Sequence, residues 1–150
     1  MAHDFVQENA ASRRELQALT ATLGDADFAR ELGNGWTVST ILCHLAFWDR
    51  LVLCRVREWQ RTGFEAVRLT AQAVDSINAA AREISRAIPG REAARLALES
   101  AEEMDAEVER LSAELIEQID AGGFERVLRR SIHRREHIAQ IEDLLGARRR

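Results

Sequence analysis

The sequence predicts an all-α protein, folded as an antiparallel, up-down four-helix bundle. Ala, Leu, Glu and Arg dominate the 150 residues, and these residue types favour helices. Apolar residues recur at spacings of three and four, and no segment shows the alternation typical of a half-buried strand. The single Pro and most of the Gly residues fall between helical segments. Long helices joined by short loops form such bundles, and the length suits one domain over residues 1–150.

Two long helices are expected in the first half of the chain. The first runs from about His3 to Thr22 and ends at Gly24. An irregular connection then leads to Thr37, a residue type that caps helix N-termini well. The second helix continues to about Thr62, and its apolar stripe consists of Ile41, Leu45, Trp48, Val52 and Val56.

Three further segments are expected to be helical in the second half of the chain. One begins at Thr70 and ends at Pro89, because proline and the residue before it disfavour a continuing helix. A long helix then covers residues 91–110, and a short piece continues through Ile119. The last helix covers residues 124–145.

The composition excludes several kinds of chemistry. All 21 basic residues are Arg, so the chain has no lysine for a Schiff base or a phosphate loop. It also has no Tyr, which removes phenol acid–base chemistry. The groups left for catalysis are four His, two Cys, the carboxylates and the guanidinium groups.

Charge and hydropathy point to a cytoplasmic protein that binds neither nucleic acid nor membranes. The formal net charge is −4, whereas a nucleic-acid-binding surface is basic. The uninterrupted basic run Arg148–Arg150 is best explained as a solvated terminus. The first residues show no signal-peptide pattern, and no apolar stretch reaches the roughly 18 residues of a membrane span.

Three of the four histidines suggest a metal site. His133 and His137 lie four residues apart, so both imidazoles share one helix face, roughly 6 Å apart at the backbone. His44 lies within an apolar run of the second helix and should point into the bundle, where it needs a polar partner or a metal. Ligands from facing helices converge in a bundle core. These histidines would form a three-ligand site with open coordination positions, which is typical of catalytic metals.

Other side chains near these histidines are candidates for substrate contacts. Arg129 and Arg130 lie one turn before His133 and could bind a substrate carboxylate. Glu136 flanks the histidine pair and could orient an imidazole or act as a catalytic base. Trp48 lies one turn after His44 and could form a wall of the site. Asp49 is about 140° around the helix from His44 and is therefore not expected to be a ligand.

Two segments resemble the signatures of a known family. GWTVSTILCHLAFWDR (Gly35–Arg50) and IHRREHIAQIEDLL (Ile132–Leu145) resemble the DinB-like four-helix-bundle superfamily, which includes YfiT-like metal-dependent hydrolases and thiol-dependent transferases and isomerases. Its pattern is a Trp followed by Ser or Thr, then a His in the second helix, then H-x-x-x-H in the last. The matching positions are Trp36, Thr37, His44, His133, His137 and Gln140, and Asn78 lies in a segment that looks like the family's third helix.

The resemblance implies a divalent metal, zinc or nickel, on His44, His133 and His137, and a small-molecule substrate. Such an ion can activate either water or a low-molecular-weight thiol, so hydrolysis and thiol transfer both stay open. The superfamily is often dimeric, which makes a homodimer an expectation. The chain departs from the family at residues 38–40, where an acidic residue is common, and in a short segment before the last helix, which would reduce a substrate lid.

Three alternatives remain at the level of sequence. Residues 133–137 also fit the H-x-x-E-H pattern of zinc peptidases, although this reading ignores His44. The protein could bind metal without catalysis, as a stress-response or carrier protein. It could also be a helical interaction module whose histidines are incidental.

Overall fold

The computed structural model describes residues 4–146 and confirms the all-α prediction. The predicted helix start at His3 and the basic run Arg148–Arg150 lie outside these residues. The elements, in chain order, are α1 (Asp4–Ala21), α2 (Asp25–Phe28), β1 (Glu31–Gly33), β2 (Trp36–Thr37), α3 (Val38–Thr62), α4 (Ala71–Ser85), α5 (Gly90–Glu109), α6 (Ala113–Ala121), α7 (Glu125–Leu128) and α8 (Arg130–Gly146).

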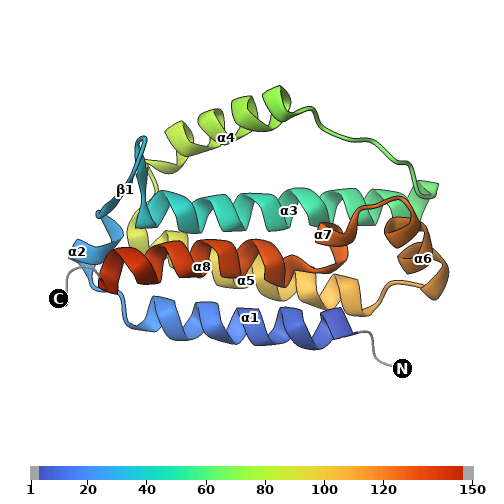
Figure 1. The fold of residues 1–150 in the computed structure, drawn as a ribbon, viewed down its shortest axis with the longest axis horizontal. Helices are drawn as coiled ribbons and strands as arrows, with labels where there is room; N and C mark the ends of the chain where they lie inside the picture. The colour runs from blue at the N-terminus through green and yellow to red at the C-terminus, as the bar shows by residue number, and fades with distance from the viewer. Residues whose placement is uncertain (1–3, 147–150) are drawn as a thin grey trace.

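Four long helices, α1, α3, α5 and α8, lie side by side as two pairs (Figure 1). Helices α3 and α5 run in the same direction, because Ser39 contacts Ile88 near their beginnings. Further along both helices, Arg57 pairs with Glu107. Helices α1 and α8 also run in the same direction, as the Arg135–Glu15 ion pair near the middle of both helices and the Arg129–Glu8 pair near their beginnings show.

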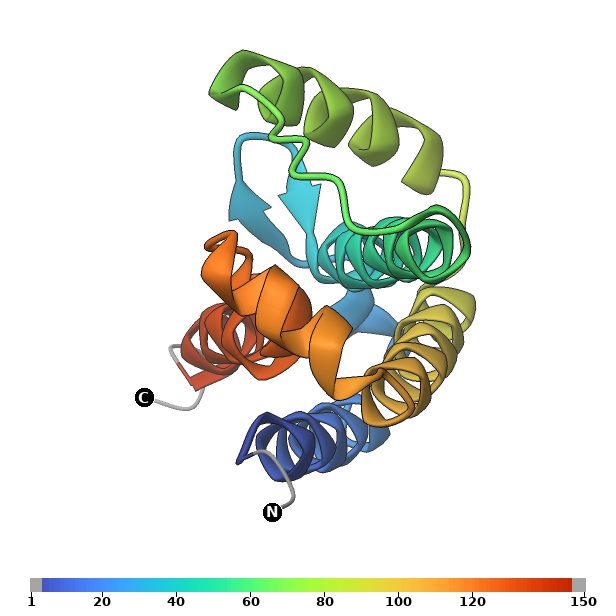
Figure 2. The same ribbon diagram turned by 90° about the vertical axis from the view of Figure 1, so that its right-hand side faces the viewer.

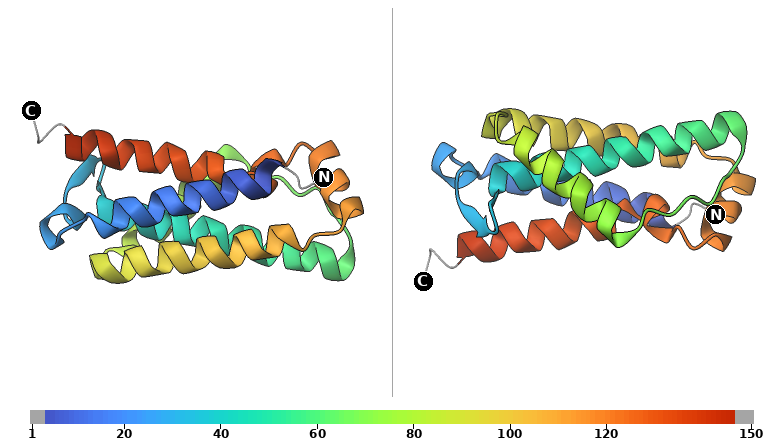
Figure 3. Two further views of the ribbon diagram at one scale, coloured as in Figure 1. Left: turned by 90° about the horizontal axis from the view of Figure 1, so that it is seen from below. Right: turned by 90° about the horizontal axis from the view of Figure 1, so that it is seen from above.

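The pair α1–α8 runs antiparallel to the pair α3–α5. Successive long helices therefore do not simply alternate in direction, as the up-down bundle expected from the sequence would require. Helix α4 explains the difference. It leaves the end of α3 through residues 63–70 and returns to the opposite end of the molecule, where α5 begins (Figures 1 and 3). The third predicted helix is therefore a crossover packed on α3, outside the group of four (Figure 2).

Capping threonines fix the beginnings of α3 and α4. The Thr37 side chain accepts a hydrogen bond from the backbone N–H of Thr40, at 3.2 Å, and thereby fixes the start of α3, as predicted. Thr70 caps α4 in the same way through the N–H of Ala73. These caps satisfy backbone donors that a helix leaves without internal partners.

A short antiparallel hairpin, β1–β2, replaces the irregular connection that the sequence predicted before α3. Its strands have three and two residues, too few to show an alternating pattern. The turn is Asn34-Gly35, and these residues and the preceding Gly33 all have positive φ, at 53°, 78° and 115°. Glycine and asparagine are the residues that adopt this conformation most readily, so the local sequence explains the turn.

The predicted last helix is in fact two helices, α7 and α8, separated at Arg129. The side chain of buried Asn9, on α1, inserts at this break. It donates to the carbonyl of Leu128 at 2.8 Å and accepts from the N–H of Ser131 at 2.9 Å. Because Asn9 satisfies two backbone groups next to the break, the interruption costs less than an unsatisfied one would.

The core is divided along its length. One apolar cluster includes Leu16, Leu45 and Ile138, and the other includes Phe5, Val56 and Leu128. On each long helix, buried polar residues lie between the two clusters; these residues are Asn9, Ser12, Asp49, Ser100, Arg130 and Arg134. Within residues 4–146, no helix combines the length and the apolar character that crossing a membrane requires.

Candidate metal centre

The structure brings His44, on α3, together with His133 and His137, on α8. One ring nitrogen from each of these residues, here called the histidine group, lies within 4.8 Å of the others. The Nε2 atoms of His44 and His133 are 3.0 Å apart. No Cys, Asp or Glu among the described residues joins the group. The antiparallel packing of α3 on α8 therefore produces the convergence that the sequence predicted.

Burial keeps these imidazoles neutral. Loss of hydration, with smaller repulsion from His137 and Arg130, lowers the pKa of His44 to about 4. Burial is also the main cause of the lowered pKa of His133, where Arg130 adds to the effect. The pKa of His137 is lowered mainly by burial as well. A neutral imidazole is the form that binds metal ions, so none of the three rings has to lose a positive charge before it binds one at pH 7.

Gln140 orients one of the three rings. Its side-chain oxygen lies 2.8 Å from Nδ1 of His137, and an amide oxygen can only accept a hydrogen bond. The proton of His137 is therefore on Nδ1, which leaves the lone pair of Nε2 free for a ligand. Hydrogen-bond partners of this kind fix the tautomer of metal-binding histidines.

Replacing Gln140 by Met is expected to weaken zinc binding by about tenfold, because outer partners of ligating histidines contribute about 10- to 100-fold. Gln140→Glu keeps an acceptor and should retain the affinity. Gln7→Met, at an exposed position on α1, is the matched control. Competition with a chromophoric chelator measures all three. Equal affinities of Gln140→Met and the control would show that Gln140 does not orient the ring.

Arg130 contacts another of the three rings. One of its terminal nitrogens lies 3.3 Å from Nδ1 of His133. Because arginine can only donate, this contact places the His133 proton on Nε2, which then donates to Nε2 of His44. His133 is thus in a tautomer suited to a hydrogen bond, whereas His137 is already in the tautomer suited to ligation. A metal ion on Nε2 of His133 requires the ring proton to move to Nδ1, which would disrupt the contact of Nδ1 with Arg130.

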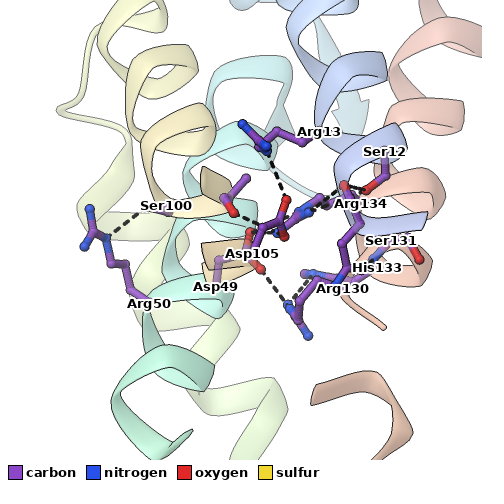
Figure 4. Close-up of polar contacts among 12 residues, drawn as sticks. Ser12, Arg13, Asp49, Arg50, Ser100, Asp105, Arg130, Ser131, His133 and Arg134 are labelled. Carbon is purple, nitrogen blue, oxygen red and sulfur yellow. Dashed lines mark hydrogen bonds and ion pairs between the residues drawn. The ribbon is translucent and has the colours of Figure 1, made fainter. Parts of the chain in front are cut away.

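Arg130 belongs to a buried ion-pair network that crosses the bundle (Figure 4). Asp49, on α3, accepts from Arg130 at 2.8 Å through one oxygen and from Arg134 at 3.2 Å through the other. Arg134 also pairs with Asp105, on α5, at 2.8 Å, and Arg13 pairs with the same carboxylate. Burial raises the pKa of Asp105, while Arg134 opposes that rise. The network ties α3, α5 and α8 together and reaches the histidine group through the contact of Arg130 with His133.

Asp49 was not expected to be a metal ligand, and its place in this ion-pair network was not predicted. Asp49 lies four residues after Leu45 and three before Val52, on the apolar stripe of α3. Arg134 similarly lies four residues before Ile138 on the buried face of α8. Charged residues are rarely buried without a partner, so charges of opposite sign on two facing stripes were the available signal.

The other predicted site residues lie in three different places. Arg129 pairs with Glu8 at 2.6 Å and with Glu125, beside α1 and away from the histidine group. Glu136 is exposed and pairs with Arg126 at 2.6 Å. Trp48 lies beside the site: its ring centroid is 6.3 Å from that of His44. The indole of Trp48 also donates to Asn78, on α4, at 2.9 Å, which ties the crossover helix to α3.

Two cavities open next to the histidine group. One, here called the polar cavity, has a volume of about 670 Å³ and is lined by His44 and His137 together with Asn34, Asn78, Gln140 and Asp143. Apolar residues complete its wall; these are Leu32, Trp36, Ile41 and Leu144. A second cavity, here called the basic cavity, has a volume of about 550 Å³ and is lined by His133, Arg68, Arg126 and Arg130. Apolar side chains complete its wall; these are Trp48, Val52, Val74, Phe124 and Val127. These volumes are in the range of small-molecule sites.

Comparison with known proteins identifies the family. A family model described as the DinB superfamily matches residues 8–147, a range that contains the whole histidine group and the buried ion-pair network. Comparison with curated proteins gave no match, and comparison with solved structures gave none. The matched range spans nearly all of the chain and agrees with the helical fold and the three converging histidines. The chain therefore belongs to the DinB superfamily, and its three-histidine group fits a metal-binding member of that superfamily.

Proposed function

We propose that the protein binds one divalent metal ion, zinc or nickel, through His44, His133 and His137, and uses it to transform a small molecule. The observation that carries this proposal is the convergence of three neutral imidazoles from two facing helices. No fourth protein ligand lies beside them among residues 4–146. Three protein ligands leave coordination positions open to a substrate, as in catalytic zinc sites.

The donor set fits such an ion. Two nitrogens bound tetrahedrally to zinc at about 2.0 Å are about 3.3 Å apart. The ring nitrogens of the histidine group are separated by 3.0 Å for His44 and His133 and by at most 4.8 Å overall, a range that includes this spacing. Imidazoles suit zinc and nickel alike, so the donors do not distinguish these metals. A bound ion would supply Lewis acidity for activating water or a thiol.

The chain's own groups would position the substrate. Asn34, Asn78 and Gln140 line the polar cavity, and amide side chains can orient a ligand through directional hydrogen bonds. The oxygens of Asn78 and Gln140 are engaged by Trp48 and His137, which leaves their NH₂ groups as donors. Asn78 is itself held by the indole of Trp48. The proposal needs no proton transfer by Glu136, whose carboxylate is bound to Arg126.

Two reaction classes use this arrangement: hydrolysis of an ester or amide, and thiol-dependent transfer. The second has one observation in its favour, because it requires two organic molecules. The polar cavity lies beside His44 and His137, and the basic cavity beside His133, so two small molecules could approach the histidine group from different sides.

An activity panel tests the proposal. Protein loaded with zinc or nickel is assayed against ester and amide substrates, and against electrophiles supplied with low-molecular-weight thiols. We expect turnover that chelators abolish and that His44→Ala lacks. A chain that binds the ion tightly but turns over nothing in either panel would instead be a non-catalytic metal carrier.

A further inference from the structure

A third cavity, here called the apolar pocket, lies between α3, α4 and the β-hairpin. Its volume is about 360 Å³, and its apolar walls are formed by Cys43, Phe47, Ile77, Ala81, Ile84 and Ile88. Trp36 and His44 line both this pocket and the polar cavity. The two spaces therefore meet at one of the three candidate metal ligands.

The polar side chains around the apolar pocket are mostly bonded within the protein. The hydroxyl of Thr40 donates to the carbonyl of Thr37 at 3.1 Å, and that of Ser85 donates to the carbonyl of Arg82 at 2.9 Å. The guanidinium of Arg82 donates to the carbonyl of Asn34 at 2.8 Å and lies over the Trp36 ring; its buried Nε is left without a partner in the described residues. Apart from this Nε, the pocket offers few free polar groups. Its walls include Phe47 and Ile84, which are 36% and 73% exposed, so an apolar occupant that covers them is favoured.

The position of α4 creates this space. Helix α4 is the crossover that packs on the outer side of α3 (Figure 2). The hydrogen bond from Trp48 to Asn78 and the contact of Arg82 with Asn34 hold it in place. Between these contacts α4 presents the small side chain of Ala81 toward the pocket. A small residue at this position keeps the pocket open next to His44.

We propose that the apolar pocket binds the alkyl or aryl group of a small molecule whose polar end reaches the histidine group. This inference rests on the proposed function and narrows the substrate class to amphiphilic molecules. The polar cavity supplies amide groups and the imidazoles for the polar end. The apolar pocket removes the hydrocarbon part from water, which stabilises the complex in proportion to the area buried.

A series of n-alkyl hydroxamates, from acetohydroxamate to decanohydroxamate, tests the inference. The hydroxamate group chelates the ion, so each member of the series reports only the effect of its chain. Calorimetric titration of the zinc-loaded protein should show the affinity rising by about fourfold per methylene group until the pocket is full. An affinity that does not change with chain length, in protein that holds zinc, would overturn the inference and leave the proposed function intact.

A matched pair of variants locates the effect. Ala81→Leu fills the pocket and should lower the affinity for octanohydroxamate by about tenfold while leaving acetohydroxamate binding unchanged. Ala79→Leu makes the same substitution at an exposed position on α4 and should change neither affinity. Equal losses of octanohydroxamate affinity in both variants would show that the alkyl chain does not bind in the apolar pocket. Failure of the wild-type protein to hold zinc would instead contradict the proposed function, so the two failures are distinguishable.

Discussion

Replacing Asp49 by Ala is expected to lower the free energy of unfolding by about 3–5 kcal/mol. The Asp49 side chain is 2% exposed and is the shared partner of Arg130 and Arg134, which are 5% and 0% exposed. Its removal takes from Arg130 its carboxylate partner and leaves Arg134 with the carboxylate of Asp105 alone. Breaking a buried ion pair is costly because the remaining charge stays dehydrated and uncompensated. Urea unfolding followed by circular dichroism measures the change.

The control for this variant is Glu103→Ala. Glu103, on α5, forms a bidentate ion pair with Arg50, on α3, but the Glu103 side chain is 45% exposed. Exposed pairs contribute about 0–1 kcal/mol, so this variant should unfold almost like the wild type. If Asp49→Ala were no less stable than Glu103→Ala, the buried network would not be holding the helices together.

The variant His44→Ala is expected to weaken binding of zinc or nickel by about a hundredfold or more, because even the outer partners of ligating histidines contribute about 10- to 100-fold. His44 is the member of the histidine group that lies on α3, so its loss leaves two ligands, both on α8. Titration against a chromophoric chelator measures the affinity. His137→Ala should behave in the same way.

The control here is His3→Ala, which changes a histidine outside the group. It should bind the ion like the wild type. Circular dichroism separates loss of a ligand from loss of the fold, since neither His44 nor His137 takes part in the Asp49 network. Unchanged affinity in both His44→Ala and His137→Ala would show that the histidines meet for another reason.

The elements of the fold followed from local sequence wherever a local signal was strong. Thr37 and Thr70 cap the helices that the sequence assigned to them. The hairpin was missed because its strands are too short for a pattern. The break at Arg129 was missed because its cause, Asn9, lies on α1, far away in sequence. The parallel pairing of α3 with α5 depends on where α4 packs, which helix periodicity does not reveal.

The histidine group was predictable for a different reason. The spacing of His133 and His137 fixes one helix face, and an imidazole at residue 44 inside an apolar stripe has to point inward. The arginines were less predictable, because a guanidinium can extend to either side of its helix. Arg129 turns toward Glu8 and Arg130 toward Asp49, although the two residues are adjacent. Such choices depend on the charges of neighbouring helices, which single-helix geometry does not contain.

Native mass spectrometry of the chain in the presence of zinc or nickel tests the central claim most directly. We predict a mass increase of one ion per chain for the wild type and none for the protein in which His44, His133 and His137 are all Ala. The same spectrum reports whether the expected homodimer forms. An unchanged wild-type mass, or an ion retained equally by the triple variant, would contradict the three-histidine metal site.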